Sequence, residues 1–214
     1  MYPNVQPYKN NYLLEQNIQI VEKPDWVSWD EIREVLWESH AENREQGIIN
    51  ALPSLPSDEI RKKVGDKGKM FVALDGKKVV ATATVLIKNK RRWYTQGDYA
   101  YVCLGAVLPA YRKSRIYFTV EKKSEVYAKS ISSLLVTDMH ENNKRIQKLR
   151  LHEGFQYVEC KAYKDHYNLV MAKWLDECPY PLWYIKFRFQ LSKLYMKTRY
   201  KMVPGKGRVK RFGI

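Results

Sequence analysis

At 214 residues, with 45% hydrophobic and 13% aromatic side chains, the chain is large and apolar enough to bury one sizeable core, which excludes a disordered protein. It contains no run of 18 apolar residues, so we expect no membrane-spanning helix. The formal net charge of +15 indicates an anionic partner or surface.

The first third of the chain predicts one strand and two helices. Residues 17–23 alternate apolar and polar side chains, which is the pattern of a half-buried strand. Ser28 followed by Glu31 forms a capping box, so a helix is expected to begin near Trp29. A second, shorter helix is expected at residues 57–65.

The rest of the chain predicts a strand-rich segment followed by alternating elements. Asp75 and Gly76 are typical of a tight hairpin that divides residues 69–87 into two strands, because both central residues of such a turn take positive φ. A further β run at 98–109 ends at Pro109. The remaining predicted elements are a helix at 114–131, a strand at 132–139, a helix at 142–154 and an antiparallel pair at 155–163 and 167–175. This order predicts an α/β fold whose largely antiparallel sheet opens into a parallel pair.

The three cysteines, Cys103, Cys160 and Cys178, include no C-x-x-C pair and have no nearby pair of histidines. This pattern predicts reduced thiols, with neither a disulfide framework nor a metal site. The start of the sequence lacks a basic segment followed by an apolar run, so no secretory leader is expected. We therefore predict a cytoplasmic protein, with a location peripheral to a membrane as the alternative.

Two motifs lie at a separation and in an element order that match a known enzyme family. The first is "LGAVLPAYRKSRI", residues 104–116. The second is "NNKRIQKLRLHEGF", residues 142–155, which is similar to Asn-x-x-Ala-x-x-Leu-Tyr-x-x-x-Gly-Phe. Across residues 17–174 the chain resembles the GNAT superfamily of acetyl-CoA-dependent N-acetyltransferases. The resemblance implies a GNAT-like mixed sheet, mostly antiparallel with a splayed parallel pair and flanked by helices.

The resemblance also implies where acetyl-CoA, the acyl donor, would bind. Backbone groups of Gly105, Ala106 and Val107 would contact the pantetheine arm. Asn143 would contact the pantetheine or hold the following helix. The pyrophosphate would lie against a loop and the first turn of the next helix, where backbone amides and the helix dipole favour an anion. That segment comprises Arg112, Lys113, Ser114, Arg115, Ile116 and Tyr117.

The chain departs from the family pattern at two places. The family's Arg-x-x-Gly-x-Gly is replaced by residues 112–117, which lack both glycines. Either the basic side chains bind phosphate in place of close backbone approach, or Arg115 and Tyr117 block the cradle. At Arg150 the family commonly has a tyrosine that protonates the leaving thiolate, a role that arginine cannot fill at neutral pH although it could stabilise the thiolate.

Transfer of an acetyl group to an amine needs a base that accepts a proton, directly or through water. The candidates near the predicted splayed strands are Tyr101, Asp138 and His140, together with Asp165 and His166 in the turn of the last hairpin. His140 lies at the end of a strand, where α/β folds commonly carry function. Each of these residues also has a purely structural interpretation.

The end of the chain is strongly basic. From Cys178 to Ile214 there are ten Lys or Arg residues and no Asp or Glu. Residues 179–202 predict a helix on which lysines 186, 193, 197 and 201 share one stripe, with Trp183, Phe187, Leu191 and Leu194 beside it. This pattern is typical of a helix at an anionic membrane surface, and the alternatives are a helix packed on its own domain or on a second copy in a homodimer.

Together these patterns predict an N-terminal extension (1–16), a GNAT-like acyltransferase domain (17–177) and a basic aromatic C-terminal helix and tail (178–214). We expect an N-acetyltransferase that acts on the primary amine of a small acceptor, such as an amino sugar of surface polysaccharide synthesis. The alternatives are an inactive GNAT-like protein that binds an acidic partner, or an acetyltransferase of nucleic-acid or protein amines. Nucleic acid is the less favoured partner, since no RNA- or DNA-binding motif occurs.

Overall fold

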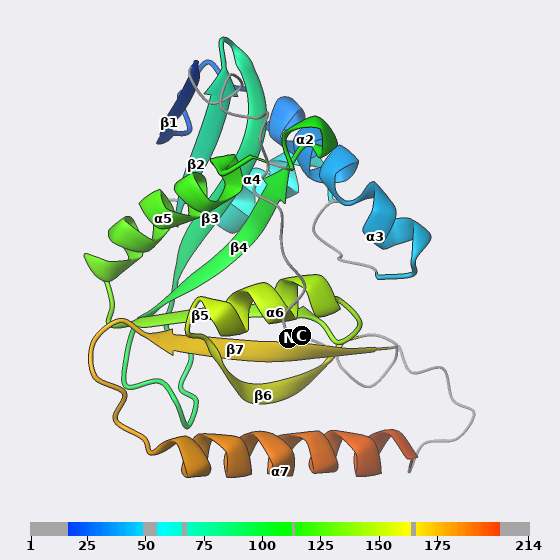
Figure 1. Ribbon diagram of the computed structural model, residues 1–214, viewed down its shortest axis with the longest axis vertical. Helices are drawn as coiled ribbons and strands as arrows, with labels where there is room; N and C mark the ends of the chain where they lie inside the picture. The colour runs from blue at the N-terminus through cyan, green and yellow to red at the C-terminus, as the bar shows by residue number, and fades with distance from the viewer. Residues whose placement is uncertain (1–16, 49–54, 66–67, 113, 164–165, 202–214) are drawn as a thin grey trace, which may run out of the picture. The chain divides into compact units, whose positions relative to one another are not determined.

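The computed structural model describes residues 17–48, 55–65, 68–112, 114–163 and 166–201 (Figure 1). Within these ranges the strands are β1 (Ile18–Glu22), β2 (Gly68–Asp75), β3 (Lys78–Lys88), β4 (Tyr99–Val107), β5 (Leu134–His140), β6 (Gln156–Tyr163) and β7 (His166–Trp174). The helices are α2 (Trp29–Ser39), α3 (Ala41–Glu45), α4 (Ser57–Val64), α5 (Ile116–Lys129), α6 (Lys144–His152) and α7 (Leu182–Lys201), with a 3₁₀ turn, η2 (Pro109–Tyr111), after β4.

The strands of the described ranges form one seven-stranded sheet in the order β1-β2-β3-β4-β5-β7-β6. The β4–β5 pair is parallel, whereas β1–β2, β2–β3, β5–β7 and β6–β7 are antiparallel. The predicted α/β class, with a mostly antiparallel sheet and one parallel pair, is therefore confirmed. The predicted helix after Ser28 is also confirmed, because the Ser28 hydroxyl accepts a hydrogen bond from the Glu31 N–H. It ends at Ser39, and the short helix α3 follows.

The chain divides into two compact units. Unit 1 comprises residues 1–42, 51–86 and 104–127, and unit 2 comprises residues 43–50, 87–103 and 128–214. Strand β4 contributes to both, with Tyr99–Cys103 in unit 2 and Leu104–Val107 in unit 1. The predicted division at residues 16 and 177 stays a prediction, and residues 1–16 lie outside the described ranges.

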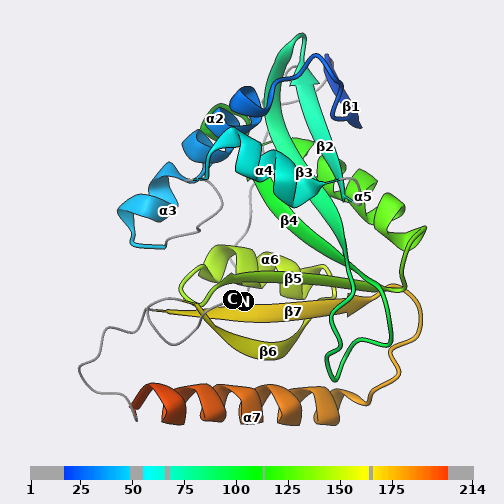
Figure 2. The same cartoon turned by 180° about the vertical axis from the view of Figure 1, so that it is seen from behind.

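Unit 1 is built on the β2–β3 hairpin that the sequence predicts. Asp75 pairs with Lys78, so the central residues of the turn are Gly76, with a φ of 59°, and Lys77. The predicted central pair, Asp75 and Gly76 with positive φ at both, is wrong by one position, because Asp75 still belongs to the β2 ladder. Helix α5 covers one face of these strands, and α2 and α4 cover the other (Figures 1 and 2). Fully buried side chains come from both helix layers and from the hairpin, among them Ile32, Ile60, Val72, Val85 and Val120.

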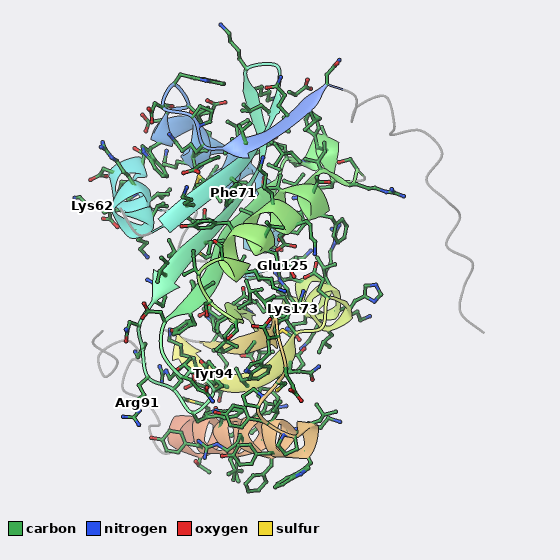
Figure 3. All side chains as sticks on the ribbon, turned by 90° about the vertical axis from the view of Figure 1, so that its left-hand side faces the viewer. Lys62, Phe71, Arg91, Tyr94, Glu125 and Lys173 are labelled. Atoms are coloured by element: carbon green, nitrogen blue, oxygen red, sulfur yellow. The ribbon has the colours of Figure 1, made fainter. Side chains whose placement is uncertain are left out.

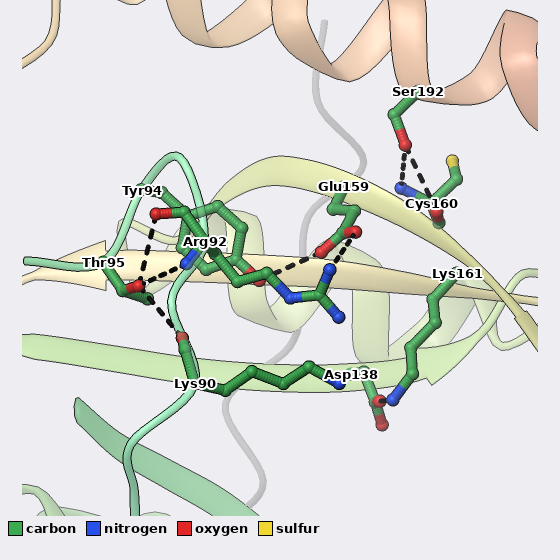
Figure 4. Close-up of polar contacts among 9 residues, drawn as sticks. All are labelled: Lys90, Arg92, Tyr94, Thr95, Asp138, Glu159, Cys160, Lys161 and Ser192. Atoms are coloured by element: carbon green, nitrogen blue, oxygen red, sulfur yellow. Dashed lines mark hydrogen bonds and ion pairs between the residues drawn. The ribbon is translucent and has the colours of Figure 1, made fainter. Parts of the chain in front are cut away.

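Unit 2 pairs β5 with β7 and β7 with the edge strand β6. Its core joins Tyr94, Tyr99, Leu134, Val136, Val158, Val170, Ala172 and Ile185. Arg92 and the hydroxyl of Tyr94 both bind the carboxylate of Glu159, at 3.3 and 3.2 Å, and so tie the segment before β4 to β6 (Figure 4). Burial, followed by the nearby Glu159 charge, raises the pKa of Tyr94, so this hydroxyl remains a donor.

Helix α7 runs along β6 and covers this edge of the sheet (Figure 1). The hydroxyl of Ser192 accepts a hydrogen bond from the Cys160 N–H at 2.8 Å and lies 3.2 Å from the Cys160 carbonyl, to which it can donate (Figure 4). Phe189 stacks on Tyr157 with ring centroids 5.1 Å apart. An uncovered edge strand would leave the N–H and carbonyl groups of β6 exposed. Because α7 covers them, we regard this helix as part of the folded unit.

Replacing Ser192 with alanine should lower the free energy of unfolding by about 1–3 kcal/mol, because the Cys160 N–H loses its acceptor in a buried position. Urea denaturation followed by circular dichroism measures this change. Thr198→Ala is the matched control, since the Thr198 hydroxyl bonds carbonyl groups of its own helix at an exposed position. Equal unfolding midpoints for the two variants would contradict the structural role of Ser192.

Candidate functional site

In unit 1, strand β4 bends at Leu104. Among the residues that the structure describes, Leu104 is the only non-glycine with positive φ, at 52°. Its carbonyl accepts a hydrogen bond of 2.7 Å from the Thr82 hydroxyl on β3, and its side chain is buried. Such a backbone costs about 1–3 kcal/mol and is common at functional sites. The bend comes immediately before the residues that the resemblance assigns to pantetheine.

Gly105 follows this bend and lies against Tyr117 of α5. A Cβ atom at Gly105 would be 2.8 Å from the Tyr117 hydroxyl. That hydroxyl donates a hydrogen bond of 3.0 Å to the carboxylate of Glu121, which is buried. A side chain at position 105 would therefore displace the Tyr117 hydroxyl. Ala106 is buried and Val107 half-buried in the same strand.

The loop after β4 is tied to α2 and α3 by Arg112. Its guanidinium donates to the Glu42 carboxylate at 2.7 Å and to the Ser39 carbonyl at 2.8 Å, and its side chain is 16% exposed. Lys113 lies outside the described residues. Both ends of the Arg112 fork thus have partners inside unit 1, although phosphate binding by this residue stays a prediction.

Helix α5 begins directly after this loop. The Ser114 hydroxyl accepts a hydrogen bond from the Ile116 N–H and donates to the Tyr111 carbonyl. The Ile116 side chain is buried. The first backbone hydrogen bond of the helix is accepted by the Arg115 carbonyl. The Ile116 N–H is thus already bonded to Ser114. The amides that follow it in the first helical turn have no acceptor within the helix, so they could bind an anion without glycine in the loop.

In unit 2, Tyr101 and Asp138 lie where the parallel ladder is short. Strands β4 and β5 pair through Ala100 with Leu135 and Tyr101 with Val136, and Asp138 is two residues farther along β5 on the Val136 face. Burial, followed by the Asp138 charge, raises the pKa of the Tyr101 hydroxyl well above its ordinary value, and this hydroxyl is hydrogen-bonded to Asp138.

The Asp138 carboxylate has a second neighbour on β6. The ammonium group of Lys161 lies 4.0 Å from one of its oxygens (Figure 4). The Asp138 side chain is 19% exposed, so a small molecule or water can reach it. A carboxylate held by a tyrosine hydroxyl and a lysine, yet open to solvent, can accept a proton from an amine.

Two buried histidines, His140 and His166, stack on each other in unit 2, and His140 follows Asp138 by two residues on β5. The rings of His140 and His166 have centroids 4.0 Å apart and an interplanar angle of 27°. The Asn142 N–H donates to Nδ1 of His140 at 3.0 Å, so in the neutral ring the proton is on Nε2. His140 can therefore donate a hydrogen bond through Nε2 more readily than it can serve as a base there.

Helix α6 carries the other two predicted cofactor residues. The Asn143 side chain is the N-cap, accepting a hydrogen bond from the Ile146 N–H at 3.3 Å. Two roles were predicted for Asn143, a contact with pantetheine and holding the following helix, and this cap performs the second. Arg150 is buried, forms an ion pair of 2.8 Å with Glu153 and packs over the ring of Phe155. A contact of either residue with a cofactor stays a prediction.

No protein-family model matches the sequence. No curated protein matches it in sequence either. Solved structures do match in fold. An acetyltransferase from Streptococcus agalactiae aligns with a TM-score of 0.58 at 18% identity, covering 75% of this chain and 99% of that chain. A GCN5-related N-acetyltransferase from Kribbella flavida has a TM-score of 0.55 at 16% identity, covering 74% and 98%. Arabidopsis thaliana NAA60 in complex with a bisubstrate analogue gives 0.55 at 15% identity, covering 74% and 100%.

The chain has the GNAT fold. This confirms the resemblance inferred from the two motifs as far as the fold is concerned, because at these identities structural likeness carries no information on substrate. The matched structures are covered almost completely, whereas about a quarter of this chain falls outside each match. The GNAT fold is thus extended in this protein.

Several residues of the site were not predicted from the sequence. Gln147 is buried and donates to the Glu141 carbonyl at 2.7 Å, while its amide oxygen accepts from the Tyr157 hydroxyl, so it holds the loop between β5 and α6. The signal that could have predicted the role of Gln147 was its position on the inner face of the predicted helix. Tyr117 and Glu121 are four residues apart on α5, and that spacing was the available signal for Glu121. Lys161 gave no signal, because its partner Asp138 lies on another strand. Within the described ranges no group of three His, Cys, Asp or Glu side chains could hold a metal.

Gly105→Ala should lower the free energy of unfolding by about 1–3 kcal/mol, the usual cost of overpacking, because the new methyl group meets the Tyr117 hydroxyl. In a Tyr117→Phe background the same substitution should cost less, since the nearest ring carbons are at 3.5 and 3.6 Å. Urea denaturation of the four proteins in this cycle measures the difference. An equal cost in both backgrounds would show that Tyr117 does not lie against β4.

Proposed function

We propose that the protein is an N-acetyltransferase that transfers an acetyl group from acetyl-CoA to the primary amine of a small acceptor. The GNAT fold supports acyl transfer in general. The observation that carries the proposal is the Tyr101–Asp138 pair beside the short β4–β5 ladder. It supplies a partly exposed carboxylate, and Tyr101 lies in the same strand, four residues before Gly105, with which the segment assigned to the acyl donor begins.

Asp138 is the proposed general base. A neutral amine must attack the thioester carbonyl, and the proton that it loses passes to Asp138 directly or through one water. Tyr101 holds the carboxylate by a hydrogen bond and, with its raised pKa, remains protonated. The ammonium group of Lys161 lies 4.0 Å from the same carboxylate and helps to fix its position. Arg150 cannot supply the proton that a CoA thiolate would need on release, so that proton would come from solvent.

The residues present fit acetyl-CoA in part. The amides at the start of α5 suit the pyrophosphate, and the backbone of Gly105 to Val107 suits the pantetheine arm. Arg115 adds charge at the same helix end. The acetylated thioester supplies the electrophile when bound, and a backbone N–H of β4 would polarise its carbonyl.

The acceptor that we propose is an amino sugar on a nucleotide or lipid carrier, as in surface polysaccharide synthesis. A partly exposed carboxylate attracts a cationic amine, and the basic end of the chain suits the phosphate of either carrier. The structures that match in fold include a putative phosphinothricin N-acetyltransferase and NAA60, and likeness at 15–16% identity does not decide the acceptor of this chain. Protein and nucleic-acid amines are therefore tested beside amino sugars.

A second function is favoured by the position of Tyr117. Its hydroxyl lies against Gly105, where the acyl donor would have to approach β4, and Arg112 is bonded to Glu42 and Ser39. In this alternative the cofactor cradle is closed and the GNAT fold serves to bind an acidic partner. Binding of acetyl-CoA decides between the two functions.

Titration calorimetry should detect acetyl-CoA binding to the full chain, and acetyl-CoA at about 100 times its dissociation constant should stabilise the fold by about 2.7 kcal/mol. Tyr117→Gly should tighten binding if the ring obstructs the cradle and weaken it if the ring contacts the cofactor. Absence of both heat and thermal stabilisation at millimolar acetyl-CoA would leave the binding-protein alternative.

Asp138→Asn should lower kcat by about 10²- to 10⁴-fold, the usual contribution of a general base, without changing the affinity for acetyl-CoA. Release of the CoA thiol is followed with nucleotide-linked amino sugars, a polyamine and a basic peptide as acceptors. The exposed Asp98→Asn is the control, since Asp98 belongs to unit 2 but lies on the surface beside Asn89. Full activity of Asp138→Asn would move the base to another residue.

A further inference from the structure

Helix α7 presents a row of large apolar side chains to solvent. Trp183, Phe187, Leu191 and Leu194 are 68%, 53%, 44% and 58% exposed. Their spacing of four, four and three residues places them on one side of the helix. Figure 3 shows side chains that project from α7 away from the strands of unit 2. We call this side the outer face of α7.

The outer face is not a result of loose packing, because the opposite side of the helix is engaged. Ile185 is 3% exposed and joins the core of unit 2. Ser192 bonds the backbone of Cys160, and the guanidinium of Arg188 lies over the Trp93 ring at 5.3 Å. These contacts fix the rotation of α7 about its axis. A fixed rotation holds the apolar row outward.

A row of lysines borders the apolar row. Lys186, Lys193 and Lys197 are all exposed and follow one another at seven and four residues, which keeps them on one stripe. No Asp or Glu occurs between Cys178 and Ile214. The side chain of Lys201, which belongs to the predicted stripe, lies outside the described residues. The outer face is thus apolar in its centre and cationic along one border.

This arrangement fits a second copy of the chain poorly. In an antiparallel pair of α7 helices, equivalent borders face each other, so the lysine row of one copy would oppose that of the other. In a parallel pair the lysines would face the other border of the partner helix, and α7 has no carboxylate anywhere. An anionic surface that also accepts apolar side chains can bind both the lysine row and the apolar row.

We propose that the outer face of α7 binds an anionic phospholipid membrane surface. The helix lies in the plane of the interface, with Trp183, Phe187, Leu191 and Leu194 in the boundary between head groups and acyl chains. The lysine row contacts the phosphates of anionic lipids. No described helix is long and apolar enough to cross a bilayer. This inference does not depend on the proposed acetyl transfer.

Co-sedimentation of the full chain with vesicles tests the proposal. We expect binding to phosphatidylcholine mixed with phosphatidylglycerol and much weaker binding to phosphatidylcholine alone. Changing Lys186, Lys193 and Lys197 to glutamine should weaken binding by about fivefold for each lysine, on the order of a hundredfold together. The matched control changes Lys77 and Lys78 of the hairpin to glutamine together with Lys88, which alters the net charge equally at other exposed positions.

The apolar row is tested in the same way. Changing Phe187, Leu191 and Leu194 to serine should weaken vesicle binding by tenfold or more, about the worth of the apolar area withdrawn from lipid. The control changes three exposed apolar residues elsewhere to serine, namely Trp26, Val126 and Leu151.

Trp183 provides a readout of depth. Its emission should shift to the blue on anionic vesicles and be quenched by brominated lipid, and Trp183→Phe should still bind but lose this signal. The readout decides even if the serine variant fails to fold.

Three outcomes would overturn the proposal. The first is vesicle binding that both triple variants retain, or no vesicle binding at all. The second is self-association in analytical ultracentrifugation that the serine variant abolishes, with no binding to vesicles, which would assign the outer face to a second copy. The third is binding of mixed-sequence RNA or DNA that needs only the lysines and falls steeply with salt, again without vesicle binding.

Discussion

The bend of β4 at Leu104 is the constraint on which the rest of the structure depends. A leucine at a φ of 52° persists only because its carbonyl is held by Thr82 and its side chain is buried. On one side of the bend the strand pairs with β5 through Tyr101. On the other side it presents Gly105 to α5. One strand therefore contributes to two compact units, with Tyr101 in unit 2 and the proposed donor segment Gly105 to Val107 in unit 1.

The loss of glycine after β4 has a visible structural compensation. In place of a close backbone approach, Tyr117 packs on Gly105 and donates to Glu121, while Arg112 is held by Glu42 and the Ser39 carbonyl. These contacts make the loop a structural joint of unit 1. Backbone amides at the start of α5 keep their directions whatever the side chains are, because only proline lacks the N–H. Whether an anion binds here therefore depends on whether it can reach these backbone N–H groups, since the groups themselves are present.

The C-terminal helix has two faces with different physical tasks. Its inner face covers β6, the last strand of the sheet, and Ser192 bonds the backbone of Cys160, which answers the general need to protect an edge strand. Burial raises the pKa of the Cys160 thiol to about 11, so this cysteine is a packing residue. Because the inner face is specified by these contacts, the apolar and cationic residues of the outer face are not needed for the fold of unit 2.

The sequence by itself determined the elements and their order, because caps, hairpin turns and alternation are local signals: the Ser28–Glu31 cap, the hairpin at Gly76 and the strand before Pro109 all appear, although the central turn residues lie one position later than predicted. Together with two motifs, that order was enough to predict the GNAT fold. It also placed Asp138 and Tyr101 on neighbouring strands, without showing that they bond. Only the tertiary structure decided which partners the site residues have. Arg112 meets Glu42 across 70 positions, Arg150 is taken by Glu153, and Tyr117 lies against Gly105. Such choices depend on which faces of distant elements meet, and no local pattern encodes that.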